Sequence, residues 1–383
     1  NAANFIAYAA MGIPAGMLLK KIGYRKTALV AILIGFIGVF LQYMSGWAAI
    51  QSFWVYLAGA FTAGFCMCML NTVVNPMLNT LGGGGNKGNQ LVQFGGVCNS
   101  LAAVLVTIIM GSLIADATKA QIADATPALM IALGVFAFAF LVLLLVKIPE
   151  PAQENEGDKA KDKKYSAFSF RHFNLGILAI FLYMGVEVGV PTYVMQYLTT
   201  SPDATTPGLG INASIVGMIV AVYWLLMLVG RLLGGMIGGK VSSRAQITGV
   251  SILCLVLVLL GMFLPTDVMV KMPGIDWATL TIMTAQVPVG VFALILVGLC
   301  TSVMWGGIFN MAVEGLGKYT SIASGAFMTM VCGGGILIPL QGKLADVFGN
   351  FQMSYIVVLV CTAYILFYAL VGSKNVNKDI PTE

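Results

Sequence analysis

A single acidic side chain, Glu187, lies about halfway along one of the long apolar stretches of this sequence. An ionisable group in such a stretch is costly inside a membrane and is a functional hypothesis by default. Its carboxylate could bind two hydroxyl groups of a solute, hold Na⁺ or take up a proton. The alternative is a neutral acid that bonds to a neighbouring helix. Glu187 is therefore a candidate both for binding a solute and for coupling its movement to a cation.

Two asparagines, Asn71 and Asn75, lie four residues apart in another apolar stretch, so a helix would present both on one face. An amide donates and accepts hydrogen bonds, which suits the hydroxyl groups of a polar solute. Amides that faced lipid would be unsatisfied. Hydrogen bonds between helices are the alternative for both, and Asn75 could instead hold the backbone group freed by Pro76.

Further polar candidates are spread along the chain. Gln93 and Asn99 would lie about 120 degrees apart around a helix, so both cannot point squarely at one ligand. Arg231 lies inside a stretch and Glu314 ends another on the same side, so they could pair when a gate on that side is shut. Snorkelling of Arg231 to the membrane interface is the alternative. The secondary binding candidates are Tyr223, Trp224 and Asn310.

The residue content removes most enzyme chemistry. His172 is the only histidine and is expected in a loop, which excludes a histidine metal site or a Ser/His/Asp triad. The seven cysteines lie in apolar stretches without metal-type spacing and are interpreted as packing residues. The glycines 82–85 and Lys87 lack the following Ser or Thr of a phosphate-binding loop. We expect no enzyme activity, no metal and no cofactor.

The elements that would position these residues are membrane-spanning helices. The 383 residues are 59% hydrophobic and 9% charged, which excludes a water-soluble fold. A helix of roughly 20 apolar residues crosses a hydrocarbon core of about 30 Å. Eleven apolar stretches can therefore span, and they are 4–19, 27–45, 52–80, 90–115, 127–148, 174–198, 213–239, 245–264, 288–312, 322–342 and 353–372.

Positive charge is concentrated on one side of the predicted array. With loops alternating between two sides, sixteen of the twenty Lys and Arg residues fall on the side of Lys20, Lys21 and Arg25. Positive residues accumulate in short cytoplasmic loops, so this side and the C-terminus are predicted to be cytoplasmic. The net charge of +5 is thus a matter of topology and needs no nucleic-acid partner.

One long polar segment, 149–173, divides the chain. It is interpreted as a cytoplasmic linker between an N-terminal bundle, 1–148, and a C-terminal bundle, 174–383. Five stretches precede the linker and six follow it. The chain also starts without Met in an apolar stretch, so a symmetric array of six plus six helices predicts a first helix that is absent from this sequence.

An internal repeat supports the two halves. The segment 16–25 at the end of the first stretch resembles 235–244 at the end of the seventh, and Asn75 precedes a Leu-Gly pair at nearly the same spacing as Asn310 does. Homologous halves in parallel relation are typical of transporters that bind their solute near the middle of the membrane.

Several short motifs together carry a family resemblance. The loop Gly16-x3-Lys20-Lys21-x-Gly23-x-Arg25 resembles the signature loop of the major facilitator superfamily, although its fifth position, usually Asp, is Lys20 here. That departure matches the fucose-galactose-hexose:cation symporter family. The other motifs, in the order of that family, are Pro14-Ala-Gly16, Asn71-Thr-Val-Val-Asn75-Pro76, Asn99-Ser100, Tyr183-Met-Gly-Val-Glu187, Gly230-Arg231 and Gly333-Gly-Gly-Ile-x-x-Pro339.

This resemblance implies an all-α membrane protein with the major facilitator fold, two pseudo-symmetric six-helix bundles that rock around one site. The implied solute is a small sugar such as glucose, galactose or fucose, moved by symport with H⁺ or Na⁺ across a bacterial inner membrane by a monomer. Asn99 matches a substrate-side asparagine of the family, and Trp305 matches a cavity aromatic on which a sugar ring can lie, or else a packed aromatic. Lys20, Lys21 and Arg25 are expected to take part in gating.

Coupling and solute stay open at this point. Fucose-transporting members have a protonatable Glu at the position of Asn71, so their coupling does not carry over, whereas hexose members often have Glu at the position of Glu187. An uncoupled facilitator, or a symporter for an amino sugar or a sugar acid, is one alternative. A transporter-like sensor that binds its ligand without transport is another.

Overall fold

The computed structural model describes residues 2–47, 49–113, 125–148, 165–276, 281–377 and 379–382. The N-terminal helices are α1 (Ala2–Ser45), α2 (Phe53–Leu81), α3 (Gly85–Leu113) and α4 (Thr126–Leu145). The C-terminal helices are α5 (Arg171–Thr199), α6 (Ala213–Gly238), α7 (Ser243–Phe263), α8 (Val289–Val313), α9 (Thr320–Thr329), α10 (Gly333–Phe348), α11 (Phe351–Ser354) and α12 (Ile356–Phe367). Short helical turns are η3 (Ala167–Ser169), η4 (Gly317–Tyr319), η5 (Met330–Cys332) and η6 (Tyr368–Gly372).

The helices account for all eleven predicted spans. Nine helical segments of the described residues are long and apolar enough to cross a membrane. α1 holds two of the predicted stretches, and α3, which is not among the nine, holds another. Successive short helices complete single spans, as α9, η5 and α10 do. The prediction of an all-α membrane fold is thus confirmed.

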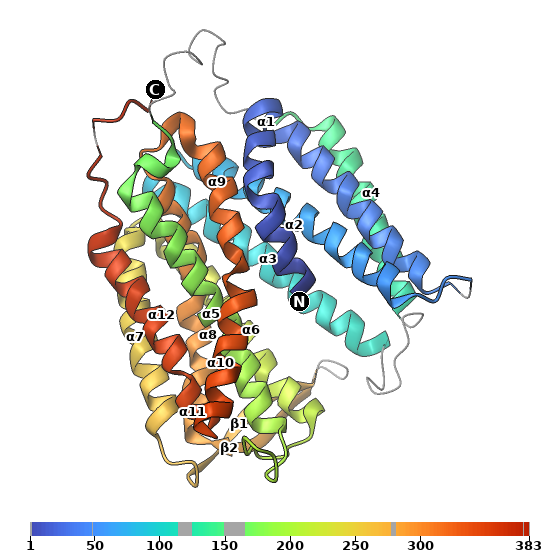
Figure 1. Ribbon diagram of the computed structural model, residues 1–383, viewed down its shortest axis with the longest axis vertical. Helices are drawn as coiled ribbons and strands as arrows, with labels where there is room; N and C mark the ends of the chain where they lie inside the picture. Colours follow the sequence, from blue (N-terminus) through green and yellow to red (C-terminus); the bar gives the residue numbers. More distant parts are fainter. Residues whose placement is uncertain are drawn as a thin grey trace.

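The first two spans are continuous in hydrogen bonding but not in direction. The backbone at Gly23 has φ 81° and ψ 178°, a conformation that glycine adopts without steric cost. The chain therefore turns back there, and the two halves of α1 meet at this turn and diverge from it in Figure 1. The expected loop between these spans is reduced to this kink.

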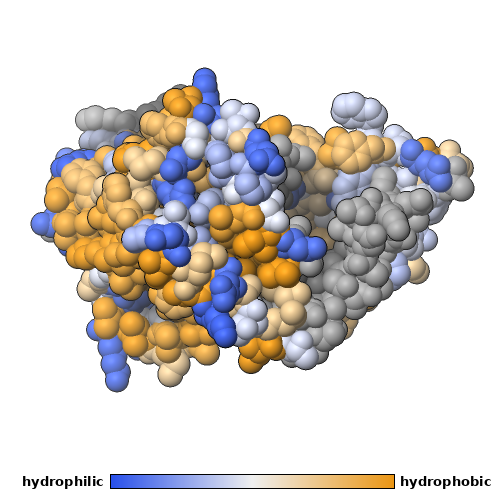
Figure 2. Space-filling view, turned by 90° about the horizontal axis from the view of Figure 1, so that it is seen from below, coloured by the Kyte–Doolittle hydropathy of each residue, from blue (hydrophilic) through white to orange (hydrophobic). Residues whose placement is uncertain are grey.

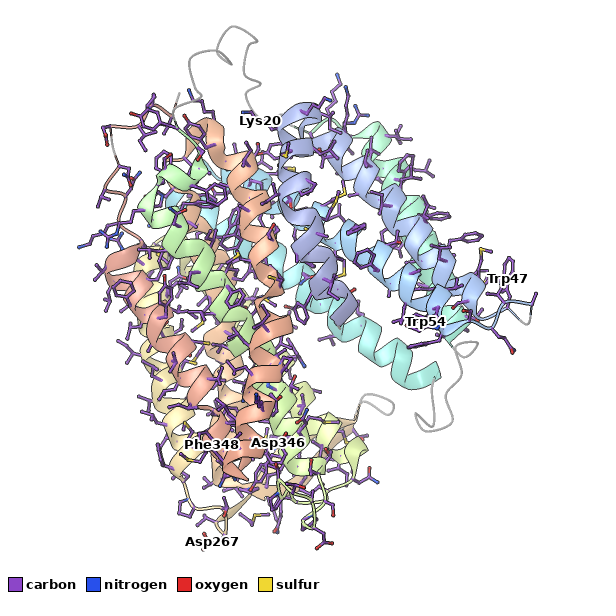
Figure 3. The ribbon with its side chains drawn as sticks, in the orientation of Figure 1. Lys20, Trp47, Trp54, Asp267, Asp346 and Phe348 are labelled. Atoms are coloured by element: carbon purple, nitrogen blue, oxygen red, sulfur yellow. The ribbon has the colours of Figure 1, made fainter. Side chains whose placement is uncertain are left out.

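The two groups of helices touch at one end and diverge toward the other (Figure 1). Lys20 marks the end where they meet, which we call the Lys20 end (Figure 3). Trp47, Trp54 and Asp267 mark the opposite end (Figure 3). We call this the hairpin end, because the strands β1 (Met269–Asp276) and β2 (Thr281–Pro288) form an antiparallel hairpin there.

Close contact at the Lys20 end depends on glycines. A Cβ added at Gly325 of α9 would lie 2.4 Å from the backbone oxygen of Gly12 in α1. A Cβ added at Gly16 would lie 2.7 Å from the oxygen of Ser321. Small residues allow helix backbones to approach in this way inside membranes. The Gly16 position of the signature motif thus has a packing role between the two groups.

The outer surface suits a lipid environment. None of the 20 residues of α4 is buried, and they are almost all apolar. Seen from the hairpin end, hydrophobic residues cover much of the left part of the molecule, with hydrophilic residues scattered among them (Figure 2). Trp47 and Trp54 are 43% and 79% exposed, as expected for aromatic residues at a membrane interface.

Three local expectations differ from the structure. The hairpin β1–β2 was not predicted. His172 is fully buried in the first turn of α5 rather than in a loop, and its Nε2 lies 3.0 Å from the backbone oxygen of Glu314. Residues 149–164 of the predicted linker 149–173 lie outside the described residues. Its remaining part forms η3 and the start of α5, three residues earlier than expected.

Candidate functional site

A cavity of about 570 Å³ lies between the N-terminal and the C-terminal helices. Its walls come from α1, α2 and α3 on one side and from α5, α6, α8 and η5 on the other. This volume is in the range of small-molecule sites. The residues predicted from the sequence that border it are Asn71, Asn75, Gln93, Asn99, Glu187, Trp224, Arg231 and Trp305.

An ion pair forms part of the cavity wall. Nη2 of Arg231, in α6, lies 3.5 Å from Oε1 of Glu187, in α5, and the two side chains are only 10% and 12% exposed. A charge in such a place is costly unless it is paired and hydrogen-bonded, so each group offsets the desolvation of the other. The single acid among the lining residues is thus paired with a cation, and the side chain of Tyr183 also bonds to it.

The same guanidinium joins the two groups of helices. Nη1 of Arg231 donates to the backbone oxygen of Gly96 at 3.1 Å and to Oγ of Ser100 at 2.8 Å, both in α3. A Cβ added at Gly96 would lie 3.3 Å from Cδ of Arg231, so the glycine leaves room for the arginine. A change in the charge of Glu187 would therefore alter the electrostatic interaction of Arg231, which also bonds to the N-terminal helices.

Hydrogen bonds orient the two asparagines of α2. Nδ2 of Asn71 donates to the hydroxyl of Tyr8 at 2.7 Å. Nδ2 of Asn75 donates to the backbone oxygen of Asn71 at 2.8 Å. Asn75 thus bonds to its own helix one turn back, next to the backbone oxygen that Pro76 leaves without its usual donor. Asn75 lines the cavity, and its amide bonds to the oxygen of Asn71 rather than to the oxygen of Thr72, which is the one that Pro76 leaves without a donor.

Aromatic side chains fix one face of the cavity. The ring of Trp305 lies 6.2 Å from that of Tyr183 and 6.0 Å from that of Phe327, with the latter pair edge to face. Trp224 borders the cavity from α6 and is 39% exposed. Rings held by neighbouring rings present a preformed apolar surface, against which the C–H face of a ring-shaped solute can lie.

The two candidates of α3 lie differently, as their spacing predicted. Gln93 is 3% exposed, and its Nε2 donates to Oε1 of Gln246 in α7 at 3.0 Å. Asn99 is exposed and borders the cavity. Gln93 is therefore engaged between the helix groups, while Asn99 is available to a solute.

Tyr223 and Asn310 do not border the cavity as it is lined by the described residues. The fully buried Tyr223 donates its hydroxyl to the backbone oxygen of Glu187 at 3.0 Å, so it supports the coupling candidate from behind. Asn310 lies nearer the Lys20 end. Its Oδ1 accepts from Nδ2 of Asn79, and its Nδ2 donates to Oγ of Ser243 at 2.8 Å.

The gating candidates are separated from one another. In the described part of the chain Arg231 pairs with Glu187 and not, as predicted, with Glu314. The reason is depth, because Arg231 is 8% exposed at the cavity whereas Glu314 is exposed at the end of α8. Lys20 and Lys21 are exposed at the Lys20 end. Nε of Arg25 donates to the backbone oxygen of Leu143 at 2.9 Å, so Arg25 binds the end of α4.

Three polar residues in or near the cavity were not predicted from the sequence. Asn4 and Tyr8 both border the cavity from α1. Their spacing of four residues in an apolar stretch is the same signal that identified Asn71 and Asn75. Asn79, the partner of Asn310, continues that spacing by one further turn of α2.

The chemistry of the cavity is that of reversible binding. It combines amides, hydroxyl groups, indole rings and one ion pair, and no nucleophile with an adjacent base is apparent among these residues. Within the described ranges there is no group of three or more His, Cys, Asp or Glu residues that could hold a metal.

Comparison with known proteins decides the family. A profile of the Major Facilitator Superfamily matches residues 1–339. The chain belongs to this superfamily. It is 28% identical over 377 residues to the glucose/galactose transporter of Brucella abortus, covering 97% of this chain and 84% of the relative. It is 23% identical over 404 residues to the L-fucose-proton symporter of Escherichia coli, covering 98% and 84%.

The fold agrees with this assignment. The chain superposes on a crystal structure of FucP, a major facilitator superfamily transporter in the outward conformation, with a TM-score of 0.79 at 21% identity. The match covers 97% of this chain and 89% of FucP. The resemblance predicted from the motifs is confirmed, and as a member of a superfamily of transporters the chain is a multi-pass membrane protein and not an enzyme.

Proposed function

We propose that the protein is a secondary active transporter that moves a small hexose such as glucose, galactose or fucose by symport with H⁺ or Na⁺. The observation that carries this proposal is the cavity between two groups of helices, walled by amides, indoles and a single carboxylate–guanidinium pair. Relatives named as a glucose/galactose transporter and an L-fucose-proton symporter support the same class of solute.

Binding would use the two kinds of wall together. Asn71, Asn75 and Asn99 offer amides to the sugar hydroxyls, and Trp305 and Trp224 offer ring faces to its C–H surface. Because the amides of α2 are already oriented by their own hydrogen bonds, little side-chain freedom would be lost when the sugar binds.

Coupling would use Glu187. Its carboxylate can accept a proton, which removes the charge that holds Arg231, or bind Na⁺, which competes with Arg231 for that charge. Arg231 also bonds to Gly96 and Ser100 of the N-terminal helices, so ion binding would alter a contact between the two groups. Alternating access then follows as the groups rock around the cavity.

The orientation belongs to the same proposal. The Lys20 end faces the cytoplasm of a bacterial cell, with the C-terminus on that side and the protein acting as a monomer in the inner membrane. The bundles are 1–148 and 174–383, joined by the cytoplasmic segment 149–173. Lys20 and Lys21, exposed beside the closed contact, would act in gating at that surface.

Counterflow in proteoliposomes tests this function. Vesicles loaded with unlabelled glucose are diluted into tracer amounts of labelled glucose, galactose or fucose. Transient uptake of at least one label above the level of protein-free vesicles is expected, because exchange needs no net ion movement. Binding without exchange would identify a sensor and would overturn the proposal.

One observation favours a second candidate, an uncoupled facilitator or a carrier of another polar solute. Glu187 is already neutralised by Arg231 in this structure, so a cation is not needed to compensate its charge. Counterflow with labelled glucosamine or glucuronate in place of hexose would identify the other solutes, since an amino sugar or sugar acid would exchange where the hexoses do not.

A further inference from the structure

Five amide side chains gather between the cavity and the Lys20 end, where the two groups of helices meet. We call them the amide cluster, and they are Asn79 of α2, Asn89 and Gln93 of α3, Gln246 of α7 and Asn310 of α8. All except Asn79 are more than nine-tenths buried. Gln93 also borders the cavity, whereas the other four lie outside its lining, so the cluster extends from the solute site toward the Lys20 end.

Two hydrogen bonds of the cluster cross from one group of helices to the other. Nδ2 of Asn79 donates to Oδ1 of Asn310 at 2.5 Å, and Nε2 of Gln93 donates to Oε1 of Gln246 at 3.0 Å. Both bonds would break if the groups separated at this end. They therefore stabilise the state in which the Lys20 end is closed.

Other atoms of the same cluster have no such partner. Asn89 is fully buried, and neither Nδ2 nor Oδ1 has a hydrogen-bond partner among the described residues of the protein. The same is true of Oε1 of Gln93. A Cβ added at Gly306 would lie 3.6 Å from Oδ1 of Asn89, so this amide is directed at α8 across the boundary.

Burial of these atoms without a protein partner destabilises the closed state. A buried amide without a partner loses its bonds to water, and one that holds a trapped water immobilises that water. Both conditions end when bulk water reaches the side chain. Asn89 therefore favours any arrangement in which the Lys20 end is open.

We infer that the amide cluster is the inner gate of the transporter and that it is built from two opposed sets. One set stabilises the closed state and consists of the hydrogen-bonded pairs Asn79–Asn310 and Gln93–Gln246. The other is the buried Asn89, which destabilises the closed state. The inference rests on the alternating access of the proposed function but not on the identity of the solute.

Matched substitutions test the opposed signs. Asn89→Leu removes a buried amide that has no protein partner and conserves its shape, whereas Asn79→Leu makes the same chemical change where a bond is formed. In a cysteine-free background, spin labels at Lys87→Cys and Lys240→Cys report the distance across the Lys20 end, because both positions are exposed there on opposite groups. The distance distribution is measured by electron double resonance in detergent without solute.

Asn89→Leu is expected to raise the ratio of the short to the long distance by about tenfold, and Asn79→Leu to lower it by a similar factor. Asn89→Ala, which adds no apolar bulk, should shift the ratio in the same direction as Asn89→Leu. A shift in the same direction for Asn79→Leu and Asn89→Leu would show that apolar bulk alone sets the equilibrium, and an unchanged ratio in both Asn89 variants would show that the amide is not strained by closure. Either result overturns the inference.

Folding and the proposed function are checked separately. Asn89→Leu loses no hydrogen bond to the protein, so its melting temperature in detergent should not fall below that of the parent, and a lower value in both Asn89 variants would contradict the inference. Failure of sugar counterflow in the parent protein would remove the proposed solute and leave the distance measurement unaffected.

Discussion

The ion pair between Arg231 and Glu187 predicts that Arg231→Gln destabilises the protein more when it is made alone than when it is combined with Glu187→Gln. Arg231→Gln leaves a carboxylate that is 12% exposed without the cation that lies 3.5 Å from it. Removing one partner of a buried pair typically destabilises a protein by about 3–5 kcal/mol. Replacing both charges, with Glu187→Gln added, leaves two amides that can bond to each other and no buried charge.

The double variant should therefore be more stable than Arg231→Gln alone, although it carries one more substitution. From the same range we expect a coupling energy of about 2–4 kcal/mol, the lower end reflecting a single contact rather than a bidentate one. The free energy of unfolding is measured for the wild type, Arg231→Gln, Glu187→Gln and the double variant. The measurement is made in mixed micelles of a mild detergent and dodecyl sulfate, with tryptophan fluorescence as the signal.

Ser100→Ala serves as a control, because it removes one acceptor of Arg231 and leaves the ion pair in place. It should cost about 1 kcal/mol, the typical net value of one hydrogen bond. A coupling energy below about 0.5 kcal/mol, the usual limit of additivity for independent sites, would refute the reasoning. Glu187 would then not carry a charge that depends on Arg231.

Three further expectations concern the solute, the closed contact and the topology. Asn71→Ala and Trp305→Ala should each weaken sugar binding by about 1–3 kcal/mol, since each removes one contact in a desolvated site, and titration calorimetry would show it; unchanged affinity in both would remove the site assignment. Gly325→Leu should hold the Lys20 end apart, because even a Cβ there would lie 2.4 Å from a backbone oxygen of α1, and an unchanged spin-label distance would contradict this packing role. A cysteine placed in 149–164 should react with an impermeant reagent only from the cytoplasm, and one replacing Asp203 only from outside; the reverse pattern would overturn the charge argument.

Hydropathy predicted the membrane spans, and polar residues within them predicted much of the polar part of the cavity wall. A polar residue in an apolar helix needs a partner or a water-filled space, so Asn71 and Glu187 could be identified without knowledge of the fold. Trp305 was identified only through the family resemblance. The internal repeat indicated that the two halves bind one solute between them.

The ion-pair and hydrogen-bond partners of these residues could not be predicted from the sequence, because they depend on which helices are neighbours and at what depth. Arg231 was expected to pair with Glu314, yet the packing of α5 against α6 brings Glu187 closer. The mirrored position of Asn310 suggested a solute contact, whereas the approach of α2 to α8 gives it Asn79 as a partner.

The hairpin was missed for a different reason. β1 contains Pro273 and Gly274, which are typical of turns and weaken the alternating pattern of a strand. Gly274 is needed there because a Cβ would lie 3.1 Å from the side chain of Met218 in α6. Close packing of the hairpin on α6 thus removed the signal by which a strand is recognised.

Gradient-driven accumulation by the wild-type protein and by Glu187→Gln tests the central claim most directly. Proteoliposomes are given an inward gradient of H⁺ or of Na⁺, and labelled hexose is followed inside them. The wild type should concentrate the sugar above equilibrium with at least one of the two ions. Glu187→Gln, which keeps the shape but not the charge, should fail to concentrate it while retaining a substantial part of the counterflow. Accumulation that persists in Glu187→Gln, or a wild type that never exceeds equilibrium with either ion, would contradict cation-coupled symport through Glu187.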